Sequence, residues 1–329
     1  MRLSRILLTL TLFIALPSAR AQQAALPASH DDFCSVSFDR RWTPQEKFVW
    51  ERVCAGEEAD FNATPGYGGN LDPEVPAGWP QRRVLRPAFL QMILFKDPYR
   101  RALTRHGVWI IGARFTDLVD LENAELEHPL ILEKSLLEKG VNLSRARSKF
   151  WIGFPSSKVA VGFDMYGLQL EAGLIMQNGE FPDVSLHEAP VRTLSLSGSK
   201  VTPRLDMNGF QADRGLYMAE TKFTDVDLIG AHVGGQLSLN GSKVTGKLDM
   251  NSLRVEQGLV MDNAEFTAVD LIYAHVGKLE LSDSKVTGTL NMNGLQVGGN
   301  LVMNKAEFAD VLLTGAHMRS LDLNGSKSD

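Results

Sequence analysis

The sequence of 329 residues is short of positive charge, of cysteine and of long apolar runs. Its 34 basic and 39 acidic residues give a formal net charge of −5. Because phosphate neutralisation supplies most of the affinity of nucleic-acid-binding proteins, this acidic chain is a poor candidate for that class. Beyond residue 21 no apolar run reaches the roughly 20 residues of a membrane-spanning helix, so we expect no transmembrane segment in the mature chain.

The sequence also lacks the motifs of common cofactor and metal enzymes. It has no CxxC pair and no cluster of metal-ligand residues at a recognised spacing. The Gly66-Tyr67-Gly68 triplet has neither a predicted strand before it nor a predicted helix after it, which argues against a dinucleotide fingerprint. We therefore expect no cofactor and assign no catalytic residue.

Residues 1–21 have the three parts of a secretory signal. Arg2 and Arg5 precede an apolar run, and Ala19-Arg20-Ala21 is a cleavage sequence of the A-x-A type. A membrane anchor is the alternative, but the run is shorter than the roughly 20 residues of a spanning helix. We expect cleavage after Ala21 and an exported protein, periplasmic or secreted, whose net charge falls from −5 to −8 through the loss of three arginines.

Residues 22–106 are predicted to form a helical N-terminal cap region. A helix is expected after Thr43, which is followed by Pro44 and, three residues after the cap, by Glu46 of a capping box. Residues 57–81 are rich in Gly, Pro, Asn and Asp and are predicted to be a loop, and further helices are expected over 86–95 and 97–105. These helices would cover the open end of the repeats that follow.

Cys34 and Cys54 lie on either side of the first predicted helix. In an exported chain such a pair favours one disulfide, and two free buried thiols are the alternative. The bridge would attach the N-terminal arm to the end of that helix.

Residues 107–329 contain an internal repeat. Its copies begin at Leu194, Leu237, Leu279 and Leu321, which are 43, 42 and 42 residues apart. Self-similarity at such a period is typical of stacked repeat architectures. Each block contains eight short triads, such as Leu248-Asp249-Met250, in which the outer residues are apolar or small.

This alternation predicts strands, with the first and third residues of a triad facing inward and the middle one outward. Eight triads make two square coils of four faces, stacked about 4.8 Å apart. Roughly ten such coils would fit between residue 108 and the end. The sequence therefore predicts an all-β solenoid with a small α-helical cap.

Two resemblances follow from these residues. The runs LDMNG, AEFAD and VDLIG resemble the pentapeptide-repeat family, which implies a right-handed quadrilateral β-helix and, as in that family, homodimerisation through the C-terminal coil. The N-terminal runs RWTPQEKFVWERVCAGEEADFN and RRVLRPAFLQMIL resemble a bacterial group often labelled membrane-associated oxidoreductases. That label implies redox chemistry, for which the sequence offers no motif.

The predicted coils align the outward residues into four columns. We name them the charged column, the aspartate column, the histidine column and the mixed column. The charged column runs from Lys158 to Lys327, and the aspartate column contains Asp206, Asp227, Asp249 and Asp270. The histidine column contains His232, His275 and His317. The mixed column contains Ile175, Tyr217, Val260 and Val302.

The aspartate column is a candidate divalent-cation site, because neighbouring carboxylates repel one another unless a cation lies between them. The alternative is an ordinary solvated face. The histidines occupy alternate coils, about 10 Å apart, which is too far for a shared metal. The apolar residues of the mixed column form a candidate partner face.

Taken together, the sequence predicts an exported, non-catalytic scaffold or binding module that presents flat β-helix faces to an unknown protein partner. The alternatives are a parallel β-helix enzyme acting on polysaccharides and the oxidoreductase that the N-terminal resemblance implies.

Overall fold

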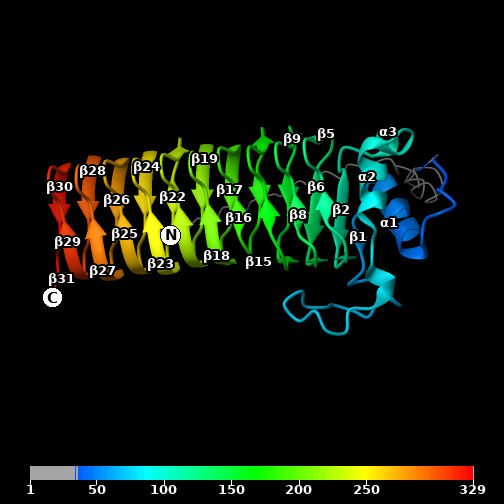
Figure 1. The fold of residues 1–329 in the computed structure, drawn as a ribbon, viewed down its shortest axis with the longest axis horizontal. Coiled ribbons are helices and arrows are strands. Elements are labelled where there is room, and N and C mark those ends of the chain that lie inside the picture. The colour runs from blue at the N-terminus through cyan, green and yellow to red at the C-terminus, as the bar shows by residue number, and fades with distance from the viewer. Residues whose placement is uncertain (1–33, 35, 329) are drawn as a thin grey trace, which may run out of the picture.

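The computed structural model describes residues 34 and 36–328 and shows a parallel β-solenoid of about ten turns (Figure 1). Helices lie at one end of the rod and the C-terminus lies at the other. This confirms the predicted all-β solenoid with a helical N-terminal region. The expected signal sequence, residues 1–21, lies outside the described residues. None of the described helices is long and apolar enough to cross a membrane.

The strands form two parallel sheets that run the length of the rod. The 16-stranded sheet contains β1 (Ala59–Asp60), β2 (Val108–Ile111), β5 (Glu125–Leu126), β6 (Leu130–Glu133), β9 (Arg147–Ser148), β10 (Ile152–Gly153), β13 (Gln169–Leu170), β14 (Leu174–Ile175), β17 (Pro190–Ser195), β19 (Gln211–Tyr217), β21 (His232–Val233), β22 (Leu237–Ser238), β24 (Arg254–Val260), β26 (His275–Glu280), β28 (Gln296–Val302) and β30 (His317–Asp322). The 15-stranded sheet contains β3 (Arg114–Phe115), β4 (Val119–Asp120), β7 (Leu136–Leu137), β8 (Val141–Asn142), β11 (Lys158–Val159), β12 (Phe163–Asp164), β15 (Glu180–Phe181), β16 (Val184–Ser185), β18 (Lys200–Asp206), β20 (Lys222–Asp227), β23 (Lys243–Asp249), β25 (Glu265–Asp270), β27 (Lys285–Asn291), β29 (Glu307–Leu312) and β31 (Lys327–Ser328).

The triads fold as their alternation predicts. In the triad at the end of β23, Leu248 and Met250 are fully buried while Asp249 between them is partly exposed. The same inward residues recur on every coil, so Leu, Met, Val and Phe side chains fill the interior as one continuous stack. Each coil is thereby held by its neighbours through backbone hydrogen bonds and through burial of a shared apolar core.

A row of buried hydroxyl groups also runs through the interior. Ser242, for example, donates its hydroxyl proton to the carbonyl of Met218 at 2.5 Å and accepts from the amide of Thr221 at 3.1 Å. Because a buried polar group without a partner is costly, these paired hydroxyls join consecutive coils at no such cost. The row comprises Ser135, Ser157, Ser199, Thr221, Ser242 and Ser284.

Some turns contain an extra glycine where two coils approach closely. A Cβ atom on Gly235 would lie 1.5 Å from the carbonyl oxygen of Arg214 on the preceding coil. Only glycine fits such a position. At Gly235 the backbones of two coils therefore touch, whereas at Gly258 the close neighbour is the side chain of Lys278.

The N-terminal region covers the first coil with α1 (Pro44–Cys54), η2 (Gln81–Arg83), α2 (Pro87–Phe95) and α3 (Tyr99–Ala102). The predicted loop over 57–81 is wrong in one respect, because β1 lies within it and pairs with β2 through Ala59 and Ile110. Two residues are too short a segment for the sequence pattern to reveal. The remainder of the loop runs beside the first coils, where residues 70–74 border a hollow shared with Lys134, Ser156 and Asn178.

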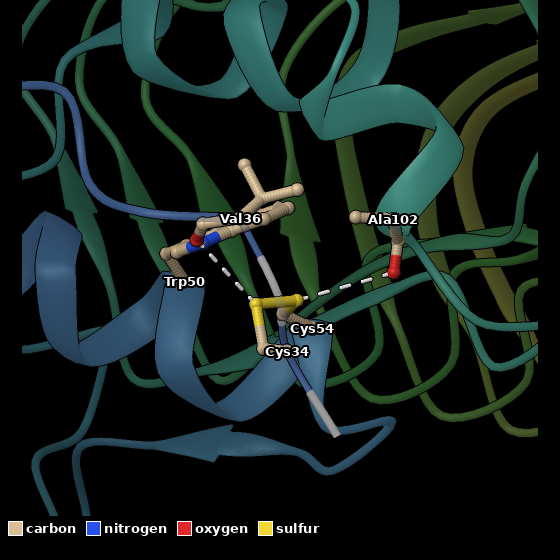
Figure 2. The surroundings of a disulfide bond; sticks show 5 residues. All are labelled: Cys34, Val36, Trp50, Cys54 and Ala102. Carbon is tan, nitrogen blue, oxygen red and sulfur yellow. Dashed lines mark hydrogen bonds between the residues drawn. A yellow bond between two sulfur atoms is a disulfide. The ribbon is translucent and has the colours of Figure 1, made fainter. Parts of the chain in front are cut away.

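A disulfide joins Cys34 to Cys54 at the end of α1, with 5.4 Å between the Cα atoms (Figure 2). Close by, the indole of Trp50 donates a hydrogen bond to the carbonyl of Val36 at 3.0 Å. The bridge and this hydrogen bond both attach the segment before α1 to the helix. Closure of a loop by a disulfide stabilises a fold mainly by restricting the unfolded chain.

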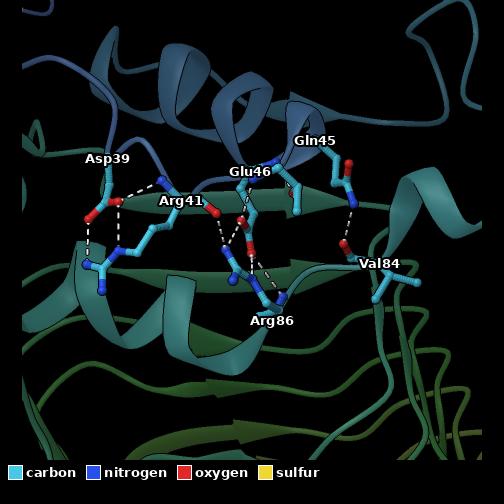
Figure 3. Close-up of polar contacts among 7 residues, drawn as sticks. Asp39, Arg41, Gln45, Glu46, Val84 and Arg86 are labelled. Carbon is cyan, nitrogen blue, oxygen red and sulfur yellow. Dashed lines mark hydrogen bonds and ion pairs between the residues drawn. The ribbon is translucent and has the colours of Figure 1, made fainter.

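The start of α1 is attached to the start of α2 by a buried carboxylate (Figure 3). Glu46, which is fully buried, accepts from the amide of Thr43 at 2.8 Å and from the Arg86 guanidinium at 2.6 and 2.8 Å. Burial raises the pKa of Glu46, but the hydrogen bonds and charge of Arg86 outweigh it and leave this pKa below its ordinary value. The capping box thus also joins two helices.

We predict that Glu46→Gln destabilises the cap by roughly 1.5–3 kcal/mol, the usual contribution of a hydrogen bond to a charged group. Because the folded-state pKa is depressed, the contribution of Glu46 is present above its unfolded pKa and is lost as the pH falls through the folded value. Urea unfolding followed by the fluorescence of the buried Trp42 and Trp50 would measure both effects.

Arg41→Ala is the matched control, since it removes an exposed ion pair with Asp39 and leaves Glu46 in place. We expect little change from it. Equal stability of Glu46→Gln and the unaltered protein at neutral pH would contradict the assignment.

Candidate functional surface

The four predicted columns of outward residues are present in the predicted register. The charged column consists of Lys158, Glu180, Lys200, Lys222, Lys243, Glu265, Lys285, Glu307 and Lys327. The aspartate column consists of Asp164, Ser185, Asp206, Asp227, Asp249, Asp270, Asn291 and Leu312. The histidine column consists of Gln211, His232, Arg254, His275, Gln296 and His317. The mixed column consists of Ile175, Ser195, Tyr217, Ser238, Val260, Glu280, Val302 and Asp322.

The charged column pairs with itself from coil to coil. The Glu180 carboxylate lies 2.8 Å from the ammonium of Lys158 and 2.9 Å from that of Lys200. The hydrogen bond from Lys158, followed by that from Lys200, holds the pKa of Glu180 below its ordinary value despite partial burial. Lys243 with Glu265 and Lys285 with Glu307 repeat this arrangement further along. Each glutamate of the column thus has a lysine partner one coil away, whereas Lys222, which lies between Lys200 and Lys243, has no ion pair within the described residues.

The aspartates of the aspartate column form ion pairs with basic side chains of neighbouring turns. Lys247 lies 2.7 Å from Asp249 and 2.8 Å from Asp270, and these two hydrogen bonds raise the pKa of Lys247. Arg204 lies 3.5 Å from Asp206 and 3.1 Å from Asp227 in the same way. Each candidate metal ligand thus has an ammonium or guanidinium partner, and the described residues contain no group of three or more metal-ligand side chains that could hold an ion.

The histidine column makes separate local contacts. His232 lies 3.1 Å from Glu256, which also accepts a hydrogen bond from Arg254 at 2.7 Å. The Nδ1 atom of His275 lies 3.1 Å from the carbonyl oxygen of Tyr273. These contacts account for two of the three histidines without bringing any two rings together.

The mixed column differs from the predicted partner face. Of the four apolar side chains predicted to form that face, only Tyr217 is exposed, at 41%, while Ile175 and Val302 are half-buried and Val260 is 5% exposed. A partner face that depends on Val260 is therefore wrong. We attribute its burial to Lys278, whose stem passes over Gly258 and whose ammonium binds Glu280, the neighbour of Val260 in the column.

Three exposed aromatic side chains lie towards the N-terminal end of the solenoid, while Tyr166, Tyr217 and Tyr273 are exposed further along it. Trp109, Phe150 and Trp151 are 37%, 38% and 44% exposed. Trp109 begins the mixed column, because its register runs through Ile131 and Gly153 to Ile175. We call Trp109, Phe150, Trp151 and Tyr217 the aromatic surface.

Phe150 and Trp151 stand in a turn where most other coils have glycine or another small residue. The ring of Trp151 lies over Gly173 of the next coil, where a Cβ atom would come within 2.5 Å of it. The sequence does contain this signal, as the pair FW among turns such as AG in residues 172–173 and GG in residues 234–235. Sequence reasoning missed it because the repeat is weakest before Ile152.

A groove of about 600 Å³ lies beside Phe150 on strands β5, β9, β13 and β17 and the start of β19. We call it the β9 groove. Its lining combines acidic, basic, amide and apolar side chains, chiefly Glu125, Glu127, Arg147, Lys149, Phe150, Gln169, Glu171, Arg192 and Asp213. A shallower hollow of about 480 Å³ follows the histidine column near the other end, between His275 and His317.

We predict that Lys247→Met destabilises the solenoid by roughly 0.2–1 kcal/mol, the range for a solvent-exposed ion pair, because Asp249 and Asp270 would then repel each other. Adding Asp249→Asn to this variant should restore stability, as measured by urea unfolding. The control is Lys222→Met in the charged column, for which we expect no change. Further loss of stability in the double variant would contradict the neutralising role of Lys247.

No family model matches the chain. No curated protein matches it either. The resemblance to pentapeptide-repeat proteins therefore depends on the residues of the repeats.

Proposed function

We propose that this protein is an exported, non-catalytic scaffold that binds a macromolecular partner on the aromatic surface. The observation that carries the proposal is the contrast between paired and unpaired faces. Glutamates of the charged column pair with lysines of the same column, and the aspartates pair with Lys247 and Arg204 of neighbouring turns, whereas four large aromatic side chains are exposed around the mixed column. Exposed aromatic residues on a rigid frame are characteristic of binding surfaces.

The frame suits such a role. Every coil is paired on both sides along most of the rod, so residues on its surface hold fixed spacings of about 4.8 Å. A partner would meet a preorganised surface and would lose little affinity to ordering it. As part of this proposal, the coils take the right-handed quadrilateral form that the pentapeptide-repeat resemblance implies.

Export is supported by the basic and apolar residues of the signal-like segment and by the disulfide. A bridge between Cys34 and Cys54 would persist in an oxidising compartment such as the periplasm or the exterior. We therefore place the binding partner outside the cytoplasm.

We predict that the immobilised mature protein retains a specific component of the exported fraction and that Trp151→Lys with Tyr217→Lys abolishes this retention. Both side chains are exposed, so these substitutions should leave the fold intact. Val161→Lys is the control, because Val161 is 57% exposed but lies outside the aromatic surface. Equal retention by the Trp151/Tyr217 variant and the control would contradict the proposal.

We also propose that a second copy of the chain covers the last described coil. Leu313, Leu321 and Leu323 there are 36%, 44% and 48% exposed, whereas Leu301, the strand neighbour of Leu321, is fully buried. Burial of such apolar area favours association at about 25 cal/mol per Å².

Light scattering of the unaltered protein should accordingly give the mass of a dimer, and Leu321→Lys with Leu323→Lys should give that of a monomer. Ser320→Lys, an exposed polar position on the same coil, is the control and should remain dimeric. A monomeric mass for the unaltered protein at micromolar concentration would contradict the interface.

A further inference from the structure

We propose that the β9 groove binds a glycan chain. This inference deepens the proposed scaffold function by naming the chemical class of one partner, and it rests on that function.

The floor of the groove stacks side chains of different chemistry on neighbouring coils. Glu125 pairs in register with Arg147, and Arg147 pairs with Gln169. A carboxylate, a guanidinium and an amide thus follow one another at intervals of about 4.8 Å. Hydrogen-bond acceptors and donors alternate along the groove as a result.

Most charged side chains of the groove have no side-chain partner in the part of the protein that the structure describes. Within the described residues, Arg147, Lys149 and Arg192 make no ion pair or side-chain hydrogen bond, and neither do Glu125 and Glu171. Only Glu127 has such a partner, Arg100 at 3.1 Å. This differs from the charged column, where Lys158, Glu180 and Lys200 satisfy one another.

The balance of these charges points to a neutral ligand rich in hydroxyl groups. Three basic side chains face three unpaired acidic ones, counting Asp213, so an ion of either sign would meet repulsion as well as attraction. A hydroxyl group, in contrast, both donates to a carboxylate and accepts from a guanidinium, ammonium or amide group. Sugars carry such hydroxyls around the whole ring.

The groove also provides an apolar surface of the right kind. Phe150 lines it and is 38% exposed, and the adjoining Trp151 is 44% exposed. An aromatic face attracts the C–H groups of a sugar ring while the hydroxyls at the ring edge reach polar side chains. Aromatic and polar groups therefore act on different parts of the same sugar.

The shape of the groove favours a chain over a single sugar. It crosses strands of four to five consecutive coils, a length on the order of 20 Å. It is open along its side, so an extended polymer can lie in it without threading.

Affinity electrophoresis of the full chain in gels containing soluble cellulose, xylan or glycol chitin tests the inference directly. We expect retardation by at least one of these neutral or weakly charged glycans. Isothermal titration with the matching oligosaccharide should then show a loss of affinity of about ten-fold or more for Phe150→Ala with Trp151→Ala, and a smaller loss for Arg147→Gln or Glu171→Gln. Tyr273→Ala removes an aromatic side chain that is 67% exposed but lies far along the rod, and it should bind as the unaltered protein does.

Three outcomes would overturn the glycan site: no retardation in any of the gels, retardation that survives the Phe150/Trp151 substitutions, or stronger binding to oligogalacturonate or to a mixed-charge peptide. These results are distinguishable from failure of the scaffold function. A protein partner retained through Trp151 without glycan binding overturns the glycan site alone, whereas the absence of any retained component overturns the scaffold proposal as well.

Discussion

Parallel pairing of each coil with the next is the constraint on which the rest of this structure depends. Because every strand has its partners about 21 residues away, each outward position repeats as a column and each inward position repeats as a layer of the core. The residue type at each position is then determined by the residues that it contacts one coil away. Glutamate is placed between lysines, Lys247 between two aspartates, and hydroxyl groups between an amide and a carbonyl of adjoining coils.

This constraint explains how much of the fold the sequence could reveal. Alternation within triads such as Leu248-Asp249-Met250 fixes which residues are buried, and the 42-residue period fixes which residues are neighbours, so all four columns were predictable. The exposure of the middle residue of a triad could not be predicted in the same way. Val260 is only 5% exposed although it is the middle residue of its triad, and nothing in that triad indicates this burial. Strand β1 escaped prediction because its two residues adopt their conformation only through pairing with β2.

The candidate site was less predictable than the fold for a related reason. Regular repeats point to the most regular residues, here the aspartate and histidine columns, whose side chains the structure shows in contact with one another or with nearby turns. The β9 groove and Phe150 lie where the repeat is weakest, close to the cap. Departures from the repeat, rather than the repeat itself, mark the surface that carries unpaired groups.

The helical cap also bears on where the groove lies, because it covers the first coil of the stack. A stack of coils needs its first apolar layer covered, and α1 and α2, joined by Glu46 and Arg86, lie over that end. The first coils can therefore tolerate irregular turns that a free end could not, and Trp109, Phe150 and Trp151 of the aromatic surface lie on them.

Hydrogen exchange of backbone amides along the whole chain, followed by mass spectrometry, tests this account most directly. If coil pairing and the cap stabilise the rod, the first coil at Val108–Ile111 should exchange as slowly as the central coils, and exchange should quicken towards β30 and β31 in the Leu321→Lys/Leu323→Lys variant, whose last coil no second copy covers. Fast exchange at Val108–Ile111, comparable to that of the last coil, would contradict the account.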